Sequence, residues 1–384
     1  MHMQYAFEPR ISQIGMTIFP KLTRSTLGPG KMNNYYDDVV KSFGIGLKEI
    51  DTGDRIVINT PTHTIQRLVS YMNVRSLVGE EVALDPQLIA TFTDYTQDLV
   101  KVMGLYVATP TWVHQFIIPF VKAYKHHRQV MIDRIIPLVR AKRASTAQGI
   151  TAPETLMQAF IDYKEPSDGA ELTEYEISQT ILMVAFASVH TTSLNLGFAL
   201  AWIMARPDLC KRLEDEIVEA FGNGPVTKDR LDQMQFLDKF LHEVYSQGAD
   251  KLGIGKRAVQ DYTFVNGCQV PKGRLIETTN RAMCVGFNKS RSTVEEMDPD
   301  VWGNRKPTNS KNDYVVFGVG KHTCPGRFFA TLEVKVALVT MLRKYTVTSL
   351  DGKPYRPVKH LLGVIATVPE TPFVLTKREK LLGH

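Results

Sequence analysis

The sequence predicts one mainly helical domain of 384 residues that carries a small β region. Apolar residues recur every three or four positions through most of residues 65–247, which is the spacing of helices with one buried face. Runs of β-branched and aromatic residues, broken by turn residues, are confined to residues 256–279 and a short C-terminal tail. Neither an internal repeat nor a low-complexity tract divides the chain, so residues 1–384 are expected to form a single domain.

Local signals place the helices. Asp85 stands directly before a proline, which is typical of an N-cap followed by the first helical residue. Thr173 and Glu176 have the spacing of a capping box. Pro119 and Pro137 are expected to bend or break the long helix that contains them. The helices predicted in this way are residues 65–79, 85–107, 112–145, 173–205, 205–222, 231–247 and 325–345, with a loop at 144–153.

Charge and cysteine content exclude several classes of function. The net charge is +6, and it is spread along the chain without a long Lys/Arg block, so nucleic acid is not an expected partner. The cysteines are far apart and form no CxxC pair, which argues against a zinc ribbon or a disulfide framework and fits a reducing compartment. They are Cys210, Cys268, Cys284 and Cys324.

Residues 177–205 contain no charged side chain and are long enough to cross a membrane. The middle of this stretch, however, holds polar side chains such as His190, Thr191 and Asn195. Polar groups are costly against lipid but reasonable beside a cavity. We therefore predict a buried core helix. The N-terminus lacks the charged and apolar regions of a signal peptide.

The segment FGVGKHTCPGRFFA, residues 317–330, surrounds a cysteine with glycines just before a predicted helix. Free N–H groups at a helix N-terminus favour a thiolate, which is the form that binds a metal. The glycines Gly320 and Gly326 permit tight turns and the close approach of a flat ligand, and Phe317 is placed to shield the sulfur. The alternative is a buried structural cysteine beside a proline-initiated helix.

The pattern Phe317-x-x-Gly320-x-x-x-Cys324-x-Gly326 resembles the haem-binding loop of the cytochrome P450 monooxygenases. The resemblance implies the cytochrome P450 fold, with haem b as cofactor, O2 as co-substrate and Cys324 as the ligand of the haem iron. It also implies that His322 donates to a haem propionate. Lys256 or Arg257 is a second candidate for binding a propionate. Alternatively, one of these cations substitutes for the arginine of the family's Glu-x-x-Arg motif, which this chain lacks.

The stretch FASVHTTS, residues 186–193, resembles the oxygen-binding part of the distal helix in this family. The resemblance assigns proton delivery to Thr191, next to Thr192. His190 stands where most members carry an acid, and its imidazole can still relay protons near neutral pH. The alternative for Thr191 is a local bond to its own preceding turn. The His-Thr-Thr sequence is similar to that of fungal members that oxidise terpenoids and indole diterpenes.

The chain departs from the family pattern at the Glu-x-x-Arg motif. Glu243 supplies the glutamate, but Ser246 occupies the arginine position, so we expect Glu243 to pair with Arg291. The membrane anchor and first helices of the family, including the helix that grips a propionate, are expected to precede the start of this chain.

Three functions remain open at this point. The first is a haem-thiolate monooxygenase that oxidises a hydrophobic small molecule with electrons from an NADPH-cytochrome P450 reductase. The second is a truncated or decayed homologue with weak or no haem binding, and the third is a helical scaffold with an unrelated cysteine. The resemblance implies the cytoplasmic face of the endoplasmic reticulum for full-length members. The chain alone reads as a soluble, cytoplasmic monomer.

Overall fold

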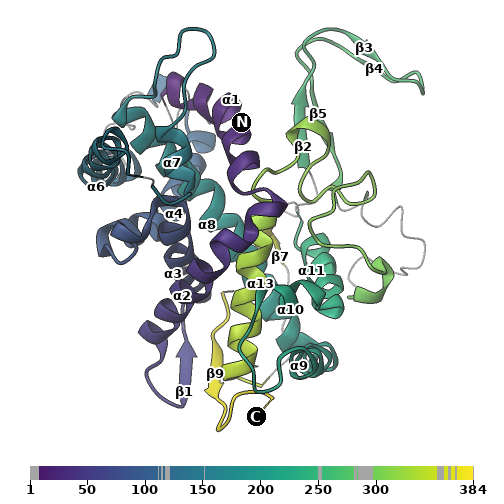
Figure 1. The fold of residues 1–384 in the computed structure, drawn as a ribbon. Helices are drawn as coiled ribbons and strands as arrows, with labels where there is room; N and C mark the ends of the chain where they lie inside the picture. Colours follow the sequence, from purple (N-terminus) through teal and green to yellow (C-terminus); the bar gives the residue numbers. More distant parts are fainter. Residues whose placement is uncertain are drawn as a thin grey trace.

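The computed structural model describes residues 8–110, 112–113, 116, 122–150, 152–249, 253–280, 283, 297–352, 359–361, 365–367 and 370–383. The fold is mainly helical with a few short strands, as predicted (Figure 1). The longer helices are α1 (Pro9–Thr26), α2 (Met32–Ile50), α3 (Pro61–Asn73), α4 (Pro86–Ala108), α6 (Lys122–Ala147), α7 (Leu156–Ile161), α8 (Glu174–Ala205), α9 (Pro207–Phe221), α10 (Lys228–Gln233), α11 (Gln235–Gln247) and α13 (Arg327–Lys344). Short turns are η2 (Pro29–Lys31), η3 (Val74–Val78), η4 (Glu80–Val82), η6 (Pro299–Trp302) and η7 (Gly320–His322).

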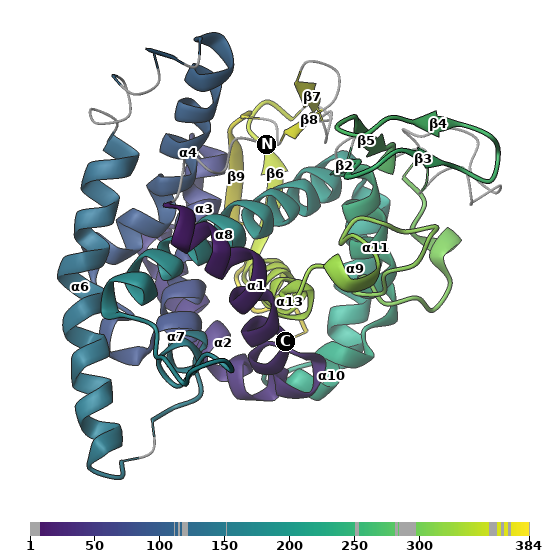
Figure 2. The same cartoon turned by 90° about the horizontal axis from the view of Figure 1, so that it is seen from above.

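Helix α8 is the centre of the molecule. Helices α3, α4 and α6 pack against it on one side, and α1, α11 and α13 also contact it. Figure 2 shows α8 crossing the molecule, with α13 seen nearly along its axis and α1 lying close to both. The two ends of α8 are buried, from Ile177 to Ala185 and from Leu196 to Ile203. The central core is therefore built around this helix.

The strands form small antiparallel sheets. The three-stranded sheet has the order β1 (Arg55–Ile58), β9 (Phe373–Lys377), β6 (Tyr345–Ser349), and it joins the first third of the chain to the C-terminal tail. The pairs β2 (Gly253–Arg257) with β5 (Leu275–Thr278) and β3 (Tyr262–Thr263) with β4 (Gln269–Val270) place strands in the β region predicted for residues 256–279. The last pair is β7 (Lys359–Leu361) with β8 (Ile365–Thr367).

The local helix signals act as predicted. The Asp85 side chain accepts hydrogen bonds from the backbone N–H groups of Gln87 and Leu88, and Thr173 and Glu176 form a complete capping box. Helix α6 runs through Pro137 without a break. Of the two alternatives expected at that proline, the break is wrong and the bend stays a prediction. Pro119 lies outside the described residues. Helices α1, α2 and α7 were not predicted. Helix α7 has only 6 residues, too few to show a clear helical period.

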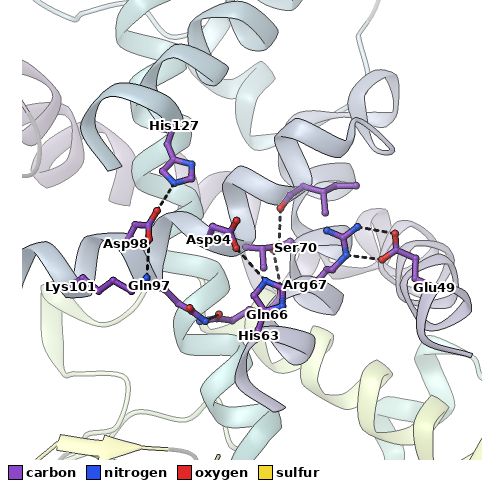
Figure 3. A network of polar contacts seen from close by, with 12 residues as sticks. Glu49, His63, Gln66, Arg67, Ser70, Asp94, Gln97, Asp98, Lys101 and His127 are labelled. Atoms are coloured by element: carbon purple, nitrogen blue, oxygen red, sulfur yellow. Dashed lines mark hydrogen bonds and ion pairs between the residues drawn. The ribbon is translucent and has the colours of Figure 1, made fainter. Parts of the chain in front are cut away.

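Polar contacts tie the helices beside α8 to one another (Figure 3). They join α2 to α3, α3 to α4, and α4 to α6. Because α3 and α6 both pack against α8, these contacts also fix the helical wall on that side of the core. The pairs are Arg67 with Glu49, His63 with Asp94, Gln97 with Gln66, and His127 with Asp98.

Helix α8 has the length and hydropathy of a membrane span, with a mean hydropathy of 1.4 in its most apolar window. In that window 61% of the residues are buried within the molecule. A buried helix of this kind is also the core helix of a water-soluble fold. The prediction of a core helix agrees with this burial.

Candidate functional site

A cavity lies between α1, α8 and the N-terminal end of α13. Helices α8 and α13 supply half of its lining residues, spaced three and four apart, which is the spacing of one helix face. The loop before α13 adds Cys324 and Pro325. On α8 the lining residues are Val184, Ala187, Ser188, Thr191 and Thr192, and on α13 they are Phe329, Ala330 and Glu333.

The middle of α8 is uncovered on the face toward this cavity. Ala187 and Thr191 are exposed, although the helix is buried on either side of them. The Ser188 hydroxyl donates to the Val184 carbonyl at 2.8 Å, and the Thr191 hydroxyl donates to the Ala187 carbonyl at 2.9 Å. The local bond considered for Thr191 is therefore formed. It uses the one proton of the hydroxyl and leaves the oxygen lone pairs as acceptors.

The three candidate residues of the His-Thr-Thr sequence do not share one face of α8. Thr191 and Thr192 both line the cavity, whereas His190 is not among the lining residues. Successive residues turn by about 100° around a helix, so the five α8 residues that line the cavity share one side of the helix and His190 falls on the other. The structure brings both threonines to the site and leaves His190 off it.

The cysteine loop is held by its own backbone. The Cys324 N–H donates to the Phe317 carbonyl at 2.7 Å, which closes the loop on itself. Gly318 and Gly320 have φ values of 72° and 67°, a region that disfavours residues with a Cβ. The Phe317 ring meets Tyr245 of α11 edge-on, with centroids 5.7 Å apart. The loop geometry thus explains why glycine and phenylalanine occupy these positions.

Two opposing effects act on the Cys324 thiol. Burial raises its pKa, while the backbone N–H of Gly326 and the charge of Arg327 lower it. Arg327 is fixed in place because its guanidinium donates to the Cys324 carbonyl at 2.8 Å and to the Thr308 carbonyl at 3.0 Å. The net pKa of the thiol is raised by burial, and the charge of Arg327 favours the thiolate. Sequence reasoning missed Arg327, although it lies within the quoted loop segment.

The residues present fit a haem group. A single thiol lines a largely apolar cavity, and an added Cβ at Gly326 in the wall would meet no atom within 4 Å. Free space beside that glycine is what a flat ligand needs. The cavity measures about 160 Å³, below the roughly 300–1,000 Å³ of most small-molecule pockets. It is an open slot rather than a closed pocket, because Ala187 and Thr191 in its wall are exposed.

Several cationic side chains lie beside the cysteine loop. The Lys256 ammonium lowers the pKa of the exposed His322 imidazole, with smaller effects from burial, Lys321 and Arg24. Arg24 of α1 also donates from Nη2 to the Lys321 carbonyl at 2.6 Å.

Arg257 is turned away, and its guanidinium donates to the Gly273 carbonyl at 2.7 Å. Adjacent strand residues point to opposite faces, so β2 brings Lys256, and not Arg257, to the loop.

Glu243 is fully buried on α11. Its carboxyl accepts hydrogen bonds from the Trp302 indole N–H at 2.6 Å and from the Gln247 amide at 2.9 Å. Arg291, the predicted partner, lies outside the described residues. Trp302 belongs to η6, so Glu243 connects α11 to the segment that leads into the cysteine loop. The sequence did not single out Trp302, because indole partners have no spacing signature.

Glu333 is a second group that sequence reasoning missed. It is fully buried on α13, lines the cavity, and accepts a hydrogen bond from the Asn73 amide of α3 at 2.9 Å. The available signal was a glutamate inside a largely apolar stretch of the helix. Nothing in that pattern says which side of α13 the glutamate occupies.

Comparisons with known proteins agree on one family. Residues 21–376 match the family model described as Cytochrome P450. The cytochrome P450 monooxygenase pyr3 of Aspergillus fumigatus is 28% identical over 311 residues, covering 77% of this chain and 59% of that protein. The cytochrome P450 monooxygenase paxQ of Penicillium paxilli is 28% identical over 307 residues, covering 75% and 57%. The chain thus spans somewhat more than half the length of these relatives.

Solved structures show the same fold. The cytochrome P450DA heme domain superposes with a TM-score of 0.76 at 17% identity, covering 94% of this chain and 77% of that structure. The retinoic acid-bound cyanobacterial CYP120A1 gives a TM-score of 0.74 at 19% identity, with 94% and 78% covered. The family model begins at residue 21, so the similarity includes the end of α1 and all of α2.

Proposed function

The chain belongs to the cytochrome P450 family, and from this we propose that it is a haem-thiolate monooxygenase acting on a hydrophobic small molecule. The observation that supports the proposal most is the shared cavity. Cys324 and the open stretch of α8 at Ala187 and Thr191 line the same space. A thiol on one wall and hydroxyl groups on the other are the two protein contributions that this chemistry requires.

When bound, haem supplies the activation of O2 and the oxidation of a C–H bond. The residues of this chain would hold the haem and surround the site of the reaction. Cys324 supplies the sulfur ligand, and the Arg327 guanidinium fixes the carbonyl of the same residue. On the opposite wall the Thr191 oxygen is available as an acceptor, since its own proton is engaged by Ala187. This oxygen can accept a hydrogen bond from a water whose other proton is available to the cavity.

The cations beside the loop suit the acidic groups of the cofactor. We propose that Lys256, His322 and Arg24 hold the propionates, because all three act on the same exposed edge of the loop. Arg24 comes from α1, which is present in this chain and packs against α8.

A matched pair of variants on β2 tests the cation assignment. Lys256→Ala is expected to weaken haem binding about tenfold, because one charge-assisted contact of about 1.4 kcal/mol is lost. Arg257→Ala is the control and should leave haem binding unchanged, since that guanidinium is bonded to Gly273. Haem titration of the apoprotein, followed by absorbance, measures both. Equal losses in the two variants would contradict the assignment.

The proposed function is tested on the full chain by spectroscopy. The haem-loaded protein is reduced and exposed to carbon monoxide, and the Soret band is recorded. A strongly red-shifted band supports thiolate ligation by this protein. A band at the position of a neutral thiol ligand would instead favour the inactive homologue, and failure to bind haem at all would overturn the proposal.

We propose only a class of substrate, a type of redox partner and a cellular location. The fungal relatives named above support a secondary-metabolite substrate of the terpenoid or indole-diterpene kind. Electrons are expected from an NADPH-dependent reductase, for which the cations around the loop offer a complementary surface to an acidic protein. We propose that the full-length enzyme acts at the endoplasmic reticulum membrane and that the catalytic domain is monomeric.

A further inference from the structure

Arg327, the first residue of α13, has no carboxylate partner in the described part of the chain. Two other arginines in the second half of the chain do have one, since Arg305 pairs with Asp313 and Arg206 pairs with Asp208. A cation in the first turn of a helix is also unfavourable, because it faces the positive end of the helix dipole. Neither an ion pair with an acid nor the stability of α13 therefore explains an arginine at this position.

Three contacts hold the guanidinium of Arg327 in one place. Its Nε donates to the Thr308 carbonyl at 3.0 Å, and its Nη1 donates to the Cys324 carbonyl at 2.8 Å. The guanidinium carbon lies 4.2 Å from the centre of the Phe328 ring. Carbonyl groups satisfy the N–H donors without cancelling the charge. The residue is half-buried, where salt screens a charge less than it does at the surface.

Cys324 is the group that can balance this charge. Burial lowers the pKa of the Arg327 guanidinium, Cys324 raises it, and the nearby charge of Arg24 lowers it further. No aspartate or glutamate in the described part of the chain contributes to this pKa. A cysteine that binds a metal does so as the thiolate, so its negative charge is present whenever iron is bound. Arg327 and Cys324 thus form a charge pair in the haem-loaded protein.

We propose that Arg327 is a positioning residue that holds a fixed positive charge beside Cys324 and thereby raises the reduction potential of the haem iron. Groups around a metal ligand are one of the means by which a protein sets such a potential. The reduced site carries one more negative charge than the oxidised site, so a nearby cation stabilises the reduced form more strongly. The inference rests on the proposed function, because it requires Cys324 to be the iron ligand.

The first test is the midpoint potential of the purified haem-loaded protein, measured by a spectroelectrochemical titration. A unit charge at roughly 10 Å, with an effective dielectric constant of about 20, changes an equilibrium about tenfold. Arg327→Gln removes the charge and keeps a side-chain donor for a carbonyl. The ratio of reduced to oxidised protein at a fixed potential should therefore fall about tenfold, which is a midpoint about 59 mV lower. Arg327→Lys keeps the charge and should change this ratio less than about threefold.

The second test separates the charge from the hydrogen bonds. Neither lysine nor glutamine can bridge both carbonyls as the arginine fork does. Urea denaturation of the haem-free protein should therefore show a similar loss of stability in Arg327→Lys and Arg327→Gln, although only the second lowers the potential. If Arg327→Gln does not fold, Arg327→Met is the second uncharged variant, since its unbranched side chain can still pack on Phe328.

Arg230→Gln is the matched control. Arg230 is exposed on α10, and its guanidinium likewise donates to a backbone carbonyl, that of Ala220, at 3.1 Å. This variant should leave the potential unchanged. An unchanged potential in Arg327→Gln, or equal falls in Arg327→Gln and Arg327→Lys, would overturn the inference, while a red-shifted band in the wild type would leave the haem-thiolate proposal intact. Absence of that band in the wild type would overturn both.

Discussion

Replacing Cys324 with serine is expected to abolish the red-shifted Soret band of the reduced, carbon monoxide-bound protein and all monooxygenase activity. The reason is chemical rather than structural. A serine hydroxyl has nearly the size of the thiol, but it is not ionised near neutral pH and does not supply the electron-rich sulfur ligand. The loop itself should persist, since it is closed by the backbone bond from residue 324 to Phe317 and by the contact of Arg327 with the carbonyl of the same residue.

Two other cysteines provide the controls for this substitution. Cys268 is exposed at the β3–β4 turn, and Cys210 is part-buried on α9. Burial raises the pKa of the Cys210 thiol to about 11, with a further rise from Glu214, so it stays protonated. Cys268→Ser and Cys210→Ser should keep the red-shifted band. If either control loses the band, or Cys324→Ser keeps it, the assignment of the iron ligand is wrong.

Replacing Glu243 with alanine is expected to lower the free energy of unfolding by about 3 kcal/mol. The carboxyl accepts from Trp302 and from Gln247 in a fully buried position, and a buried donor deprived of its acceptor costs about 1–3 kcal/mol. The effect is large against the 5–15 kcal/mol stability of an ordinary domain. Urea denaturation of the haem-free protein measures the change without contribution from the cofactor.

Glu243→Gln is the matched control for this measurement. The amide keeps the volume and an acceptor for the Trp302 indole N–H, so the loss is expected to be only about 1 kcal/mol. If the alanine and glutamine variants are equally stable, the bonds to Trp302 and Gln247 do not support this part of the fold. A haem content that falls with Glu243→Ala would further show that η6 helps to position the cysteine loop.

Local chemistry explains which predictions from the sequence succeeded. The caps at Asp85 and Thr173 depend on residues within one turn of each other, and the structure forms both. The loop around Cys324 is likewise closed by backbone bonds over seven residues. A β-hairpin depends on its turn residues, so residues 256–279 were also predictable. The helix does not break at Pro137, because the packing of α6 against α8 and α4 outweighs the loss of one helical hydrogen bond.

The sequence by itself determined that the chain is a helical domain with a cysteine loop of the haem-binding kind and a polar interruption in its central helix. Only the tertiary structure decided which groups meet there. Arg24 reaches the loop across 297 residues, and Asn73 reaches Glu333 across 260. The rotation of α8 places Thr191 and Thr192, and not His190, in the cavity wall. The alternation of side chains along β2 turns Lys256, and not Arg257, toward the loop. Such pairings depend on how distant elements pack, and the pattern of neighbouring residues does not predict that packing.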